Sequence, residues 1–216
     1  MSKPKRVFLI DSMSHIFRAF FAPMGRNQEP LRNSSGQITQ AVFVFTNILR
    51  KLLADEQPEY VAAIFDTPDP TFRHEAYEDY KANREEMPED LASQLPYIFR
   101  VCEAFNIPML KMPGFEADDI IATYAKQARE AGGDCTIISS DKDLMQLIGP
   151  QVIMYDTMKD KRVAAKQVME KFGVGPEKMI DLQSLAGDST DNIPGVPGIG
   201  PKTAAQLLDE YGDLET

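Results

Sequence analysis

Short apolar runs rich in β-branched residues recur along this chain, and three of them lead into carboxylates. The runs and the acids behind them are residues 6–10 with Asp11, residues 60–65 with Asp66, and residues 135–139 with Asp141 and Asp143. Stretches with helical spacing of apolar residues separate the runs, and this alternation predicts a parallel sheet with helices on both faces. Because parallel strands end along one edge of a sheet, we expect these acids to lie together there. A single acid behind a strand more commonly belongs to a turn.

Further strands and helices complete the predicted α/β layout. Apolar patterning predicts strands at 107–112 and 151–155 and helices at 37–56, 91–105 and 117–130. The helix at 91–105 is expected despite Pro96. A chain of 216 residues with 43% hydrophobic content can bury the core of one domain, with a small second one beside it.

Three acids fall within four positions at the start of the helix predicted at 117–130. They are Glu116, Asp118 and Asp119, in the sequence GFEADDIIATYA. Acids are favoured at a helix N-terminus because the unpaired N–H groups there carry partial positive charge, so helix capping explains one or two of them. This helix starts behind the strand at 107–112, so its first turn can lie at the same edge of the sheet as the other acids. That convergence favours metal ligands over caps alone.

The type and number of these acids indicate a bound cation. Like charges packed together disfavour ionisation unless positive charge lies among them, and in the sequence only Lys142 is interleaved with the acids. Oxygen ligands without paired His or Cys point to Mg²⁺ or Mn²⁺ and away from zinc. The carboxylates exceed what one Mg²⁺ needs, so we expect a pair of divalent cations, an arrangement suited to hydrolysis of a phosphodiester.

A glycine-rich turn predicts contact with a phosphate backbone. The sequence GVPGIGPKTAAQLL, residues 195–208, places glycines and prolines before a helix that starts with Lys202 and Thr203. Closely spaced glycines let backbone N–H groups approach a phosphate, and a helix N-terminus attracts anions. This pattern is typical of a helix-hairpin-helix, although a plain Gly/Pro turn is the alternative. Just before it, Asp188 and Asp191 can complete the acidic cluster.

Composition sets limits on location and partners. The apolar runs are far shorter than the ~20 residues of a membrane span, and the N-terminus lacks the pattern of a signal peptide. Two cysteines, Cys102 and Cys135, provide no disulfide framework, so we expect a soluble cytoplasmic protein with no membrane partner. The net charge of −10 argues against a broad basic surface for nucleic acid, so binding is expected through local contacts and bridging metals.

Five motifs in order carry a resemblance to a known family. They are FLID, FDTPDPTFRHEAYEDYKANR, GFEADDIIAT, SSDKDLMQL and GDSTDNIPGVPGIGPKTA. Together they span essentially the whole chain and resemble the 5′-nuclease domain at the N-terminus of bacterial DNA polymerase I, a branch of the flap endonuclease family. The resemblance implies a PIN-like α/β core with a helical arch and a helix-hairpin-helix region. It also implies Mg²⁺-dependent hydrolysis near 5′ ends and single-stranded flaps, in replication and repair.

Site residues follow from the resemblance, motif by motif. The metal-site acids are Asp11, Asp66, Glu116, Asp118, Asp119, Asp141, Asp143, Asp188 and Asp191, holding two Mg²⁺ ions that Mn²⁺ can replace. The catalytic residues are Lys81, Arg84 and Asp119, and the DNA-binding residues are Arg18, Arg73, Tyr80, Lys81, Arg84, Gly195, Gly198, Gly200, Lys202 and Thr203. A potassium ion at the helix-hairpin-helix is also implied.

The segment 72–84 matches the base of the family's arch. Lys81 and Arg84 are spaced i, i+3, so on a helix they share a face and can reach a phosphate across the acids. The residues alone favour a solvated helix with salt bridges, and they leave Tyr80 as a half-buried core residue and both Arg18 and Arg73 as surface residues.

The resemblance divides the chain into two parts and names its partners. Residues 1–172 are expected to form the nuclease core, with the arch at about 70–90, and residues 173–216 a helix-hairpin-helix region that ends short of the family's full length. The implied substrates are DNA with a 5′ flap or 5′ end and RNA–DNA primer junctions, cut by a monomer that carries a polymerase domain in the full-length protein.

Two other functions stay open at this point. A PIN-type ribonuclease would share the two-metal core but would not account for the glycine-rich turn or the arch-like segment. A non-catalytic DNA-binding domain would bind flaps without cutting them, although every expected metal-site acid is present.

Overall fold

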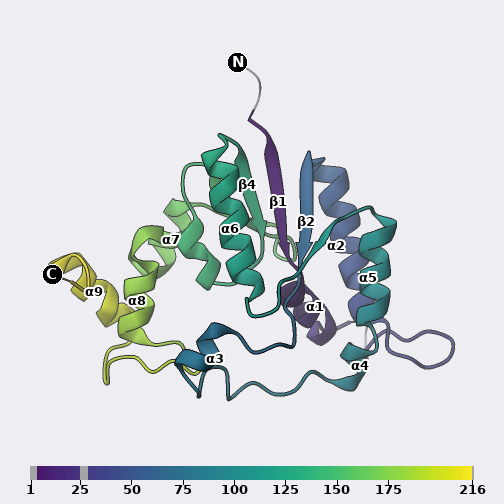
Figure 1. The fold of residues 1–216 in the computed structure, drawn as a ribbon, viewed down its shortest axis with the longest axis horizontal. Helices are drawn as coiled ribbons and strands as arrows, with labels where there is room; N and C mark the ends of the chain where they lie inside the picture. The colour runs from purple at the N-terminus through teal and green to yellow at the C-terminus, as the bar shows by residue number, and fades with distance from the viewer. Residues whose placement is uncertain (1–3, 25–28, 216) are drawn as a thin grey trace.

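The computed structural model describes residues 4–24 and 29–215, and its centre is one six-stranded sheet (Figure 1). The strands lie in the order β3-β2-β1-β4-β5-β6. Every neighbouring pair is parallel except β5 and β6, which pair antiparallel. The strands are β1 (Arg6–Asp11), β2 (Tyr60–Ile64), β3 (Met109–Leu110), β4 (Asp134–Ile138), β5 (Val152–Asp156) and β6 (Lys161–Val163).

Helices cover both faces of this sheet, as predicted. The helices are α1 (Ser12–Phe21), α2 (Gln40–Glu56), α3 (Phe72–Ala76), α4 (Glu89–Ala92), α5 (Leu95–Ala104), α6 (Ala117–Glu130), α7 (Ala165–Phe172), α8 (Met179–Ala186) and α9 (Pro201–Tyr211), with short 3₁₀ turns η1 (Asp143–Leu147) and η2 (Pro176–Lys178). Side chains alternate along β1, so Phe8 and Ile10 pack with α1, α2 and α5, whereas Leu9 packs with α6 to α9. The predicted fold class, a mostly parallel sheet between helical layers, is confirmed.

Several element boundaries differ from the sequence predictions. The strand expected at 107–112 contains only Met109 and Leu110, because it pairs with β2 alone at the edge of the sheet. The antiparallel β6 and the first helix, α1, were not predicted. None of the helices in the described part of the chain is both long enough and apolar enough to span a membrane.

The helix expected at 91–105 is two helices with a break between them. Pro96 lies in the first turn of α5, where a missing N–H costs no helical hydrogen bond. Gln94 lies in the break, and its side-chain oxygen accepts hydrogen bonds from the N–H groups of Ala41 and Val42 at the start of α2. The break therefore supplies a cap for a helix elsewhere in the fold.

The segment at 72–84 is not the continuous helix on which Lys81 and Arg84 were expected to share a face. Helix α3 ends at Ala76, and Lys81 has a left-handed backbone with φ of 57°. The N–H of Lys81 donates to the Asp191 carbonyl over 3.0 Å, so this turn docks onto the loop after α8.

The C-terminal residues pack on the α6 face of the sheet. Met179, Leu182, Ala204 and Leu208 from α8 and α9 belong to the same hydrophobic cluster as Leu9. Figure 1 shows α8 and α9 as two successive helices at this end of the molecule. The expected division of the chain after residue 172 stays a prediction.

Candidate metal centre

The carboxyl edge of the sheet gathers acids from separate strands. Asp11 ends β1 opposite Ile64, the last paired residue of β2, and Asp66 follows shortly after. Asp141 follows the end of β4, the neighbour of β1 on its other side. The negative charges of Asp66 and Asp141 both raise the pKa of Asp11, which places the three carboxylates near one another. The structure thus brings together the acids that follow the strands in the sequence.

Helix α6 starts at the same edge and adds further acids. The backbone N–H of Glu116, the N-cap residue, donates to the Asp119 carboxylate over 3.0 Å, so Asp119 caps this helix. The N–H of Ala117 donates to Asp66 over 2.8 Å, which ties the loop after β2 to the helix N-terminus. Capping and clustering therefore occur together, and Asp119 and Asp66 take part in both.

Burial and mutual repulsion raise the pKa values of two of these carboxyls. Burial first, and then the charges of Asp11 and Asp141, raise the pKa of Asp118 to about 8, against an opposing contribution from the charge of Lys81. Burial also raises the pKa of Asp11 to about 6, opposed by a 2.6 Å hydrogen bond from Ser139. The Asp118 carboxylate accepts no hydrogen bond from another residue that the structure describes. A positive charge at this position would relieve the repulsion.

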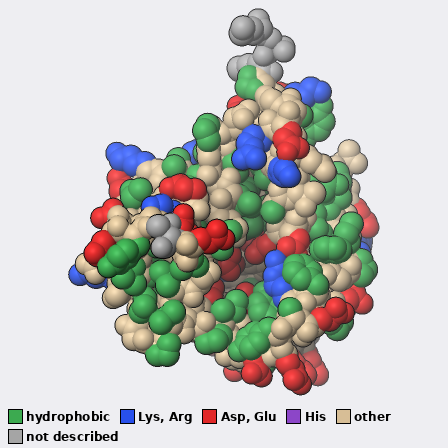
Figure 2. All heavy atoms as spheres, turned by 60° about the vertical axis from the view of Figure 1, so that its left-hand side comes forward, with side chains coloured by type: hydrophobic (Ala, Val, Ile, Leu, Met, Phe, Trp, Pro, Cys, Tyr) green, Lys and Arg blue, Asp and Glu red, His purple; other side chains and the backbone are tan. Residues whose placement is uncertain are grey.

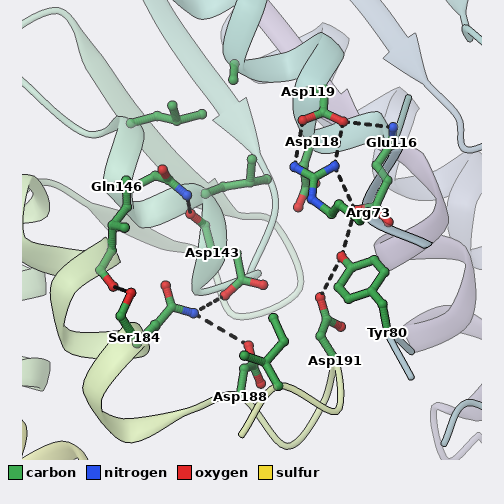
Figure 3. Close-up of a pocket in the computed structure, with 16 residues that line it drawn as sticks. Arg73, Tyr80, Glu116, Asp118, Asp119, Asp143, Gln146, Ser184, Asp188 and Asp191 are labelled. Carbon is green, nitrogen blue, oxygen red and sulfur yellow. Dashed lines mark hydrogen bonds and ion pairs between the residues drawn. The ribbon is translucent and has the colours of Figure 1, made fainter. Parts of the chain in front are cut away.

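A second group of acids, Asp143, Asp188 and Asp191, faces Glu116, Asp118 and Asp119 of the first group across a pocket (Figure 3). Asp143 lies in η1, and its N–H donates to Asp141 over 3.0 Å. The side chain of Gln183, from α8, donates to Asp143 over 2.5 Å and to Asp188 over 3.5 Å. Burial raises the pKa of Asp143 to about 6, with a further contribution from the charge of Asp141.

Basic side chains lie between the acids, contrary to the expectation that only Lys142 is interleaved with them. Arg73 binds Asp119 through both guanidinium nitrogens at 2.8 Å, and Lys142 lies 3.0 Å from Asp188. This pairing holds the pKa of Asp119 below its ordinary value. These contacts could not be predicted from the sequence, because Arg73 is far from Asp119 in the chain and the packing of α3 brings the two together.

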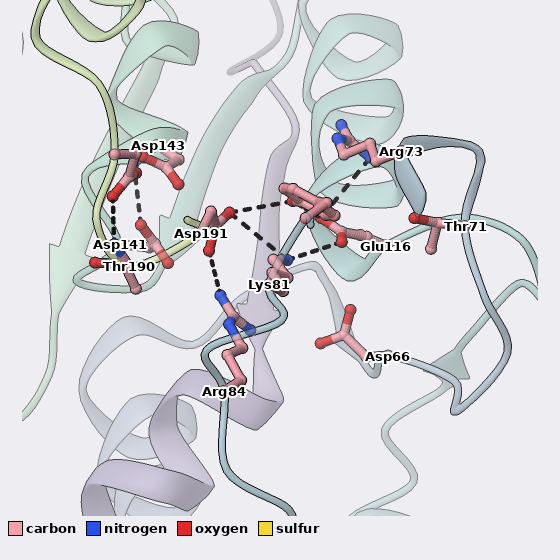
Figure 4. Close-up of polar contacts among 12 residues, drawn as sticks. Asp66, Thr71, Arg73, Lys81, Arg84, Glu116, Asp141, Asp143, Thr190 and Asp191 are labelled. Atoms are coloured by element: carbon pink, nitrogen blue, oxygen red, sulfur yellow. Dashed lines mark hydrogen bonds and ion pairs between the residues drawn. The ribbon is translucent and has the colours of Figure 1, made fainter. Parts of the chain in front are cut away.

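Lys81 joins the two groups of acids, and Arg84 pairs with Asp191 beside it (Figure 4). The Lys81 ammonium lies 2.7 Å from Glu116 and 3.8 Å from Asp191, and the Arg84 guanidinium lies 2.6 Å from Asp191. Both residues were expected to reach across the acidic cluster. The turn that contains Lys81 docks onto the loop after α8, and this docking, without a helix, brings both side chains to the acids.

Tyr80 was expected to contact DNA, but the residue is 6% exposed, so little of it is available to a base in this structure. The hydroxyl lies 3.1 Å from both Glu116 and Asp191 and can donate to one of them at a time. Burial, together with these two carboxylates, raises the pKa of the phenol. In this structure Tyr80 therefore makes polar contacts within the cluster, and its role in binding DNA stays a prediction.

Arg18, a second predicted DNA contact, is not part of the acidic cluster. Its guanidinium binds Asp156 at 3.2 Å and Ser140 at 2.7 Å. Ser140 precedes Asp141, so Arg18 lies close to the metal-site acids in the fold but pairs with an acid outside them.

The glycine-rich turn connects α8 to α9. Gly195 packs so closely on the end of α8 that an added Cβ would lie 2.4 Å from the Ala186 carbonyl carbon, which explains this glycine without a ligand. Gly198 has a φ of 83° and open space around it, and Gly200 caps α9. Lys202 and Thr203 are exposed in the first turn of α9. A role for this turn in binding phosphate stays a prediction.

Acids from both groups line a pocket of about 410 Å³, and Figure 2 shows acidic side chains within a hollow of the surface. The lining acids are Glu116, Asp118, Asp119, Asp143, Asp188 and Asp191. Within the described residues, no three of these acids form a ready-made cage for an ion. The donors are nevertheless all oxygen atoms, and the Asp118 carboxylate accepts no hydrogen bond from another described residue, so the residues present fit hard divalent cations in type and charge. Cation binding would require the basic side chains to move or share their carboxylates.

Sequence reasoning missed two residues of this site, Gln183 and Ser139. Each holds an acid in place, Gln183 through Asp143 and Ser139 through Asp11. No sequence pattern singles out either residue as part of the site, because a glutamine on a helix and a serine at the end of a strand are both common.

Comparison with known families identifies the two parts of the chain. Residues 6–173 match the family described as 5′-3′ exonuclease, N-terminal resolvase-like domain. The chain belongs to the 5′-3′ exonuclease family. Residues 174–216 match a second description from the same family, the 5′-3′ exonuclease C-terminal SAM fold. The resemblance drawn from the five motifs is therefore confirmed.

Curated relatives and solved structures agree with this membership. The chain is 54% identical to DNA polymerase I of Rhizobium leguminosarum, matching over 100% of this chain and 22% of the relative. It is 39% identical to the 5′-3′ exonuclease of Aquifex aeolicus, over 98% of this chain and 71% of the relative. The structure of T5 5′-exonuclease with bound zinc is similar in fold, with a TM-score of 0.81, 23% identity, and coverage of 97% of this chain and 76% of that one. The chain thus spans less than a quarter of the length of the polymerase relative.

Proposed function

We propose that this chain is a structure-specific 5′-nuclease that hydrolyses phosphodiesters at 5′ ends and at the base of 5′ flaps. The observation that carries the proposal is the convergence of carboxylates on one pocket, from the start of α6, from η1 and from the loop after α8. The acids that follow the strands lie close enough for their charges to raise the pKa of Asp118, which lines that pocket. Family membership supports the same chemistry. The proposed substrates are flapped DNA and RNA–DNA primer junctions.

Divalent cations are the proposed cofactors, with Mg²⁺ as the physiological ion and Mn²⁺ as a substitute. Asp11, Asp66 and Asp118 would hold one ion with Glu116, and the second group of acids would hold the other. Bound there, the ions would activate water and stabilise charge on the attacking and leaving oxygens. Neighbouring structures named as metal-bound T5 nucleases support divalent metal binding in this fold.

Basic residues of the pocket have a proposed role in holding the substrate. Arg73 lines the acidic pocket, and Lys81 and Arg84 pair with the lining acids Glu116 and Asp191. A phosphate that approaches the cations there would meet these basic side chains. Their charge would stabilise the phosphate as negative charge develops on its oxygens. Each basic side chain must leave its carboxylate before it can donate to a phosphate. We therefore infer that the metal ions take over the carboxylates while the basic side chains move to the substrate phosphate.

The remaining proposals concern how the chain is organised and what it contacts. We infer that residues 1–172 form the nuclease core and that residues 173–216 grip duplex backbone at the glycine-rich turn, with a potassium ion there. We also propose that the chain acts as a monomer in the cytoplasm and adjoins a polymerase domain in the full-length protein.

Cleavage of a labelled 5′-flap duplex in Mg²⁺, Mn²⁺ and EDTA tests the proposed activity. An Asp119→Ala variant and an unstructured single-stranded RNA substrate are run beside the wild type. We expect metal-dependent cutting at the flap junction that the variant loses. Cutting of the RNA alone would replace the proposal with a ribonuclease, and metal-dependent binding without cutting would replace it with a binding domain.

A further inference from the structure

An exposed aromatic pair lies beside the acidic pocket. Phe72 opens α3, and Phe115 lies just ahead of α6. Their ring centroids are 6.1 Å apart and their planes meet at 60°. Because the rings meet at an angle and do not stack, both residues keep solvent contact, with 49% of Phe72 and 43% of Phe115 exposed.

Chain geometry fixes this pair to the acids. Phe72 precedes Arg73 and Phe115 precedes Glu116, and neighbouring Cα atoms lie about 3.8 Å apart. The Arg73 guanidinium carbon lies 4.6 Å from the centre of the Phe72 ring, and the same guanidinium binds Asp119. The aromatic rings therefore lie at the rim of the pocket, next to two residues that line it.

We propose that Phe72 and Phe115 form a stacking platform for an unpaired nucleobase that adjoins the cleaved phosphodiester. This inference rests on the proposed nuclease function. Exposed aromatic rings bind single-stranded nucleic acid without sequence preference, because every base presents a π-face. The platform would hold the strand in register with the pocket while the acids and basic residues act on the phosphate.

The size of the pair favours a base as its occupant. A stable protein partner buries about 800 Å² on each side, whereas one aromatic side chain offers at most about 250 Å². Arg73 adds a cation at the edge of the platform, suited to the phosphate that accompanies the base.

Abasic substrates combined with leucine variants test the proposal. The substrates are a 5′-flap duplex and a set of matched duplexes with one abasic nucleotide at each position flanking the cleavage site. The proteins are the wild type and the Phe72→Leu/Phe115→Leu double variant, which keeps apolar bulk beneath Arg73 but has no aromatic face. At one position we expect the abasic nucleotide to lower the wild-type kcat/KM by about 5- to 150-fold, and to lower that of the variant hardly at all.

A binding measurement reports on the platform without catalysis. With 2-aminopurine at the sensitive position and Ca²⁺ in place of Mg²⁺, we expect the wild type to quench the fluorescence and the double variant to leave it unquenched. Equal abasic penalties in both proteins at every position, or equal quenching, would overturn the proposal. If the double variant lowers kcat/KM by the same factor on the intact and the abasic substrates, the pair only supports Arg73 and does not stack on a base.

A control separates this effect from the loss of any exposed ring. Tyr60 is 49% exposed at the start of β2, at the opposite edge of the sheet from the acids. The Tyr60→Leu variant should show the full wild-type response to the abasic nucleotide. If the wild type fails to cut the intact flap, the proposed function fails, and the fluorescence measurement still decides whether the pair binds a base.

Discussion

The Gln183 side chain donates a hydrogen bond to Asp143 over 2.5 Å, and this contact joins α8 to the turn behind β4. Its amide also reaches Asp188, so one neutral residue orients two acids from different segments. Such supporting contacts commonly change metal affinity by about 10–100-fold when they are removed. Gln183 is therefore a positioning residue for the second group of acids.

We predict that Gln183→Leu weakens the binding of one divalent cation by about tenfold and leaves the other unchanged. Calorimetric titration of the full chain with Mn²⁺ measures both affinities. Gln146→Leu is the matched control, because the Gln146 amide donates to the backbone carbonyl of Asp143 and leaves the carboxylate alone. Equal affinities in the wild type and the Gln183 variant would contradict the prediction.

Lys81→Met should lower the single-turnover rate of flap cleavage by about 10²–10³-fold, as loss of a preorganised charge beside a reacting group does. The ammonium lies 2.7 Å from Glu116 and 3.8 Å from Asp191, between acids of the two groups. Lys126→Met removes an exposed lysine that pairs with Glu130 on α6, and should leave the rate unchanged. A similar rate for both variants would remove Lys81 from the catalytic group.

The raised pKa of Asp118 predicts that the metal-free protein loses stability as the pH rises. Its pKa moves from 3.8 to about 8 on folding, so between these values the folded chain holds a proton that the unfolded chain has released. The contribution of Asp118 to the free energy of unfolding is fully present below pH 4 and is lost as the pH rises to 8. We expect Asp118→Asn in EDTA to melt at least about 4 °C above the wild type at pH 8 and close to it at pH 4.

Thermal melts across this pH range, with and without Mg²⁺, check the Asp118 prediction. Mg²⁺ should stabilise the wild type more at pH 8 than at pH 4, because it competes with the proton. Asp69→Asn, a change at an exposed acid ahead of α3, is the control and should follow the wild type. The prediction is wrong if the Asp118 variant and the wild type melt together at both pH values.

Gly187→Ala should destabilise the fold by about 1–3 kcal/mol. Gly187 has a φ of 74°, and an added Cβ would lie 2.4 Å from the Gly195 nitrogen, so neither backbone nor neighbour can accept it. Gly149→Ala is the matched control, since Gly149 has open space and no left-handed backbone. Chemical unfolding followed by circular dichroism compares the two, and equal midpoints would contradict the prediction.

The sequence determined the sheet and the identity of its acids to a large extent. Strand-like runs that end in Asp11, Asp66 and Asp141 placed these acids at one edge, because parallel strands share a direction. The apolar pattern of each run and the acid behind it are local features of the sequence. Pairing the runs as parallel strands is enough to bring the acids to one edge of the sheet. For the same reason the sequence placed the start of α6 correctly, beside the edge where the strands end.

Only the tertiary structure decided which charges meet. Arg73 reaches Asp119, and Lys81 reaches Glu116 and Asp191, across separations along the chain that no pattern encodes. The left-handed turn at Lys81 forms because its backbone docks onto Asp191, a contact that outweighs the local preference for helix. Local propensity and periodicity fix elements, whereas contacts between distant segments depend on how those elements pack, and the chemistry of this pocket depends on such contacts.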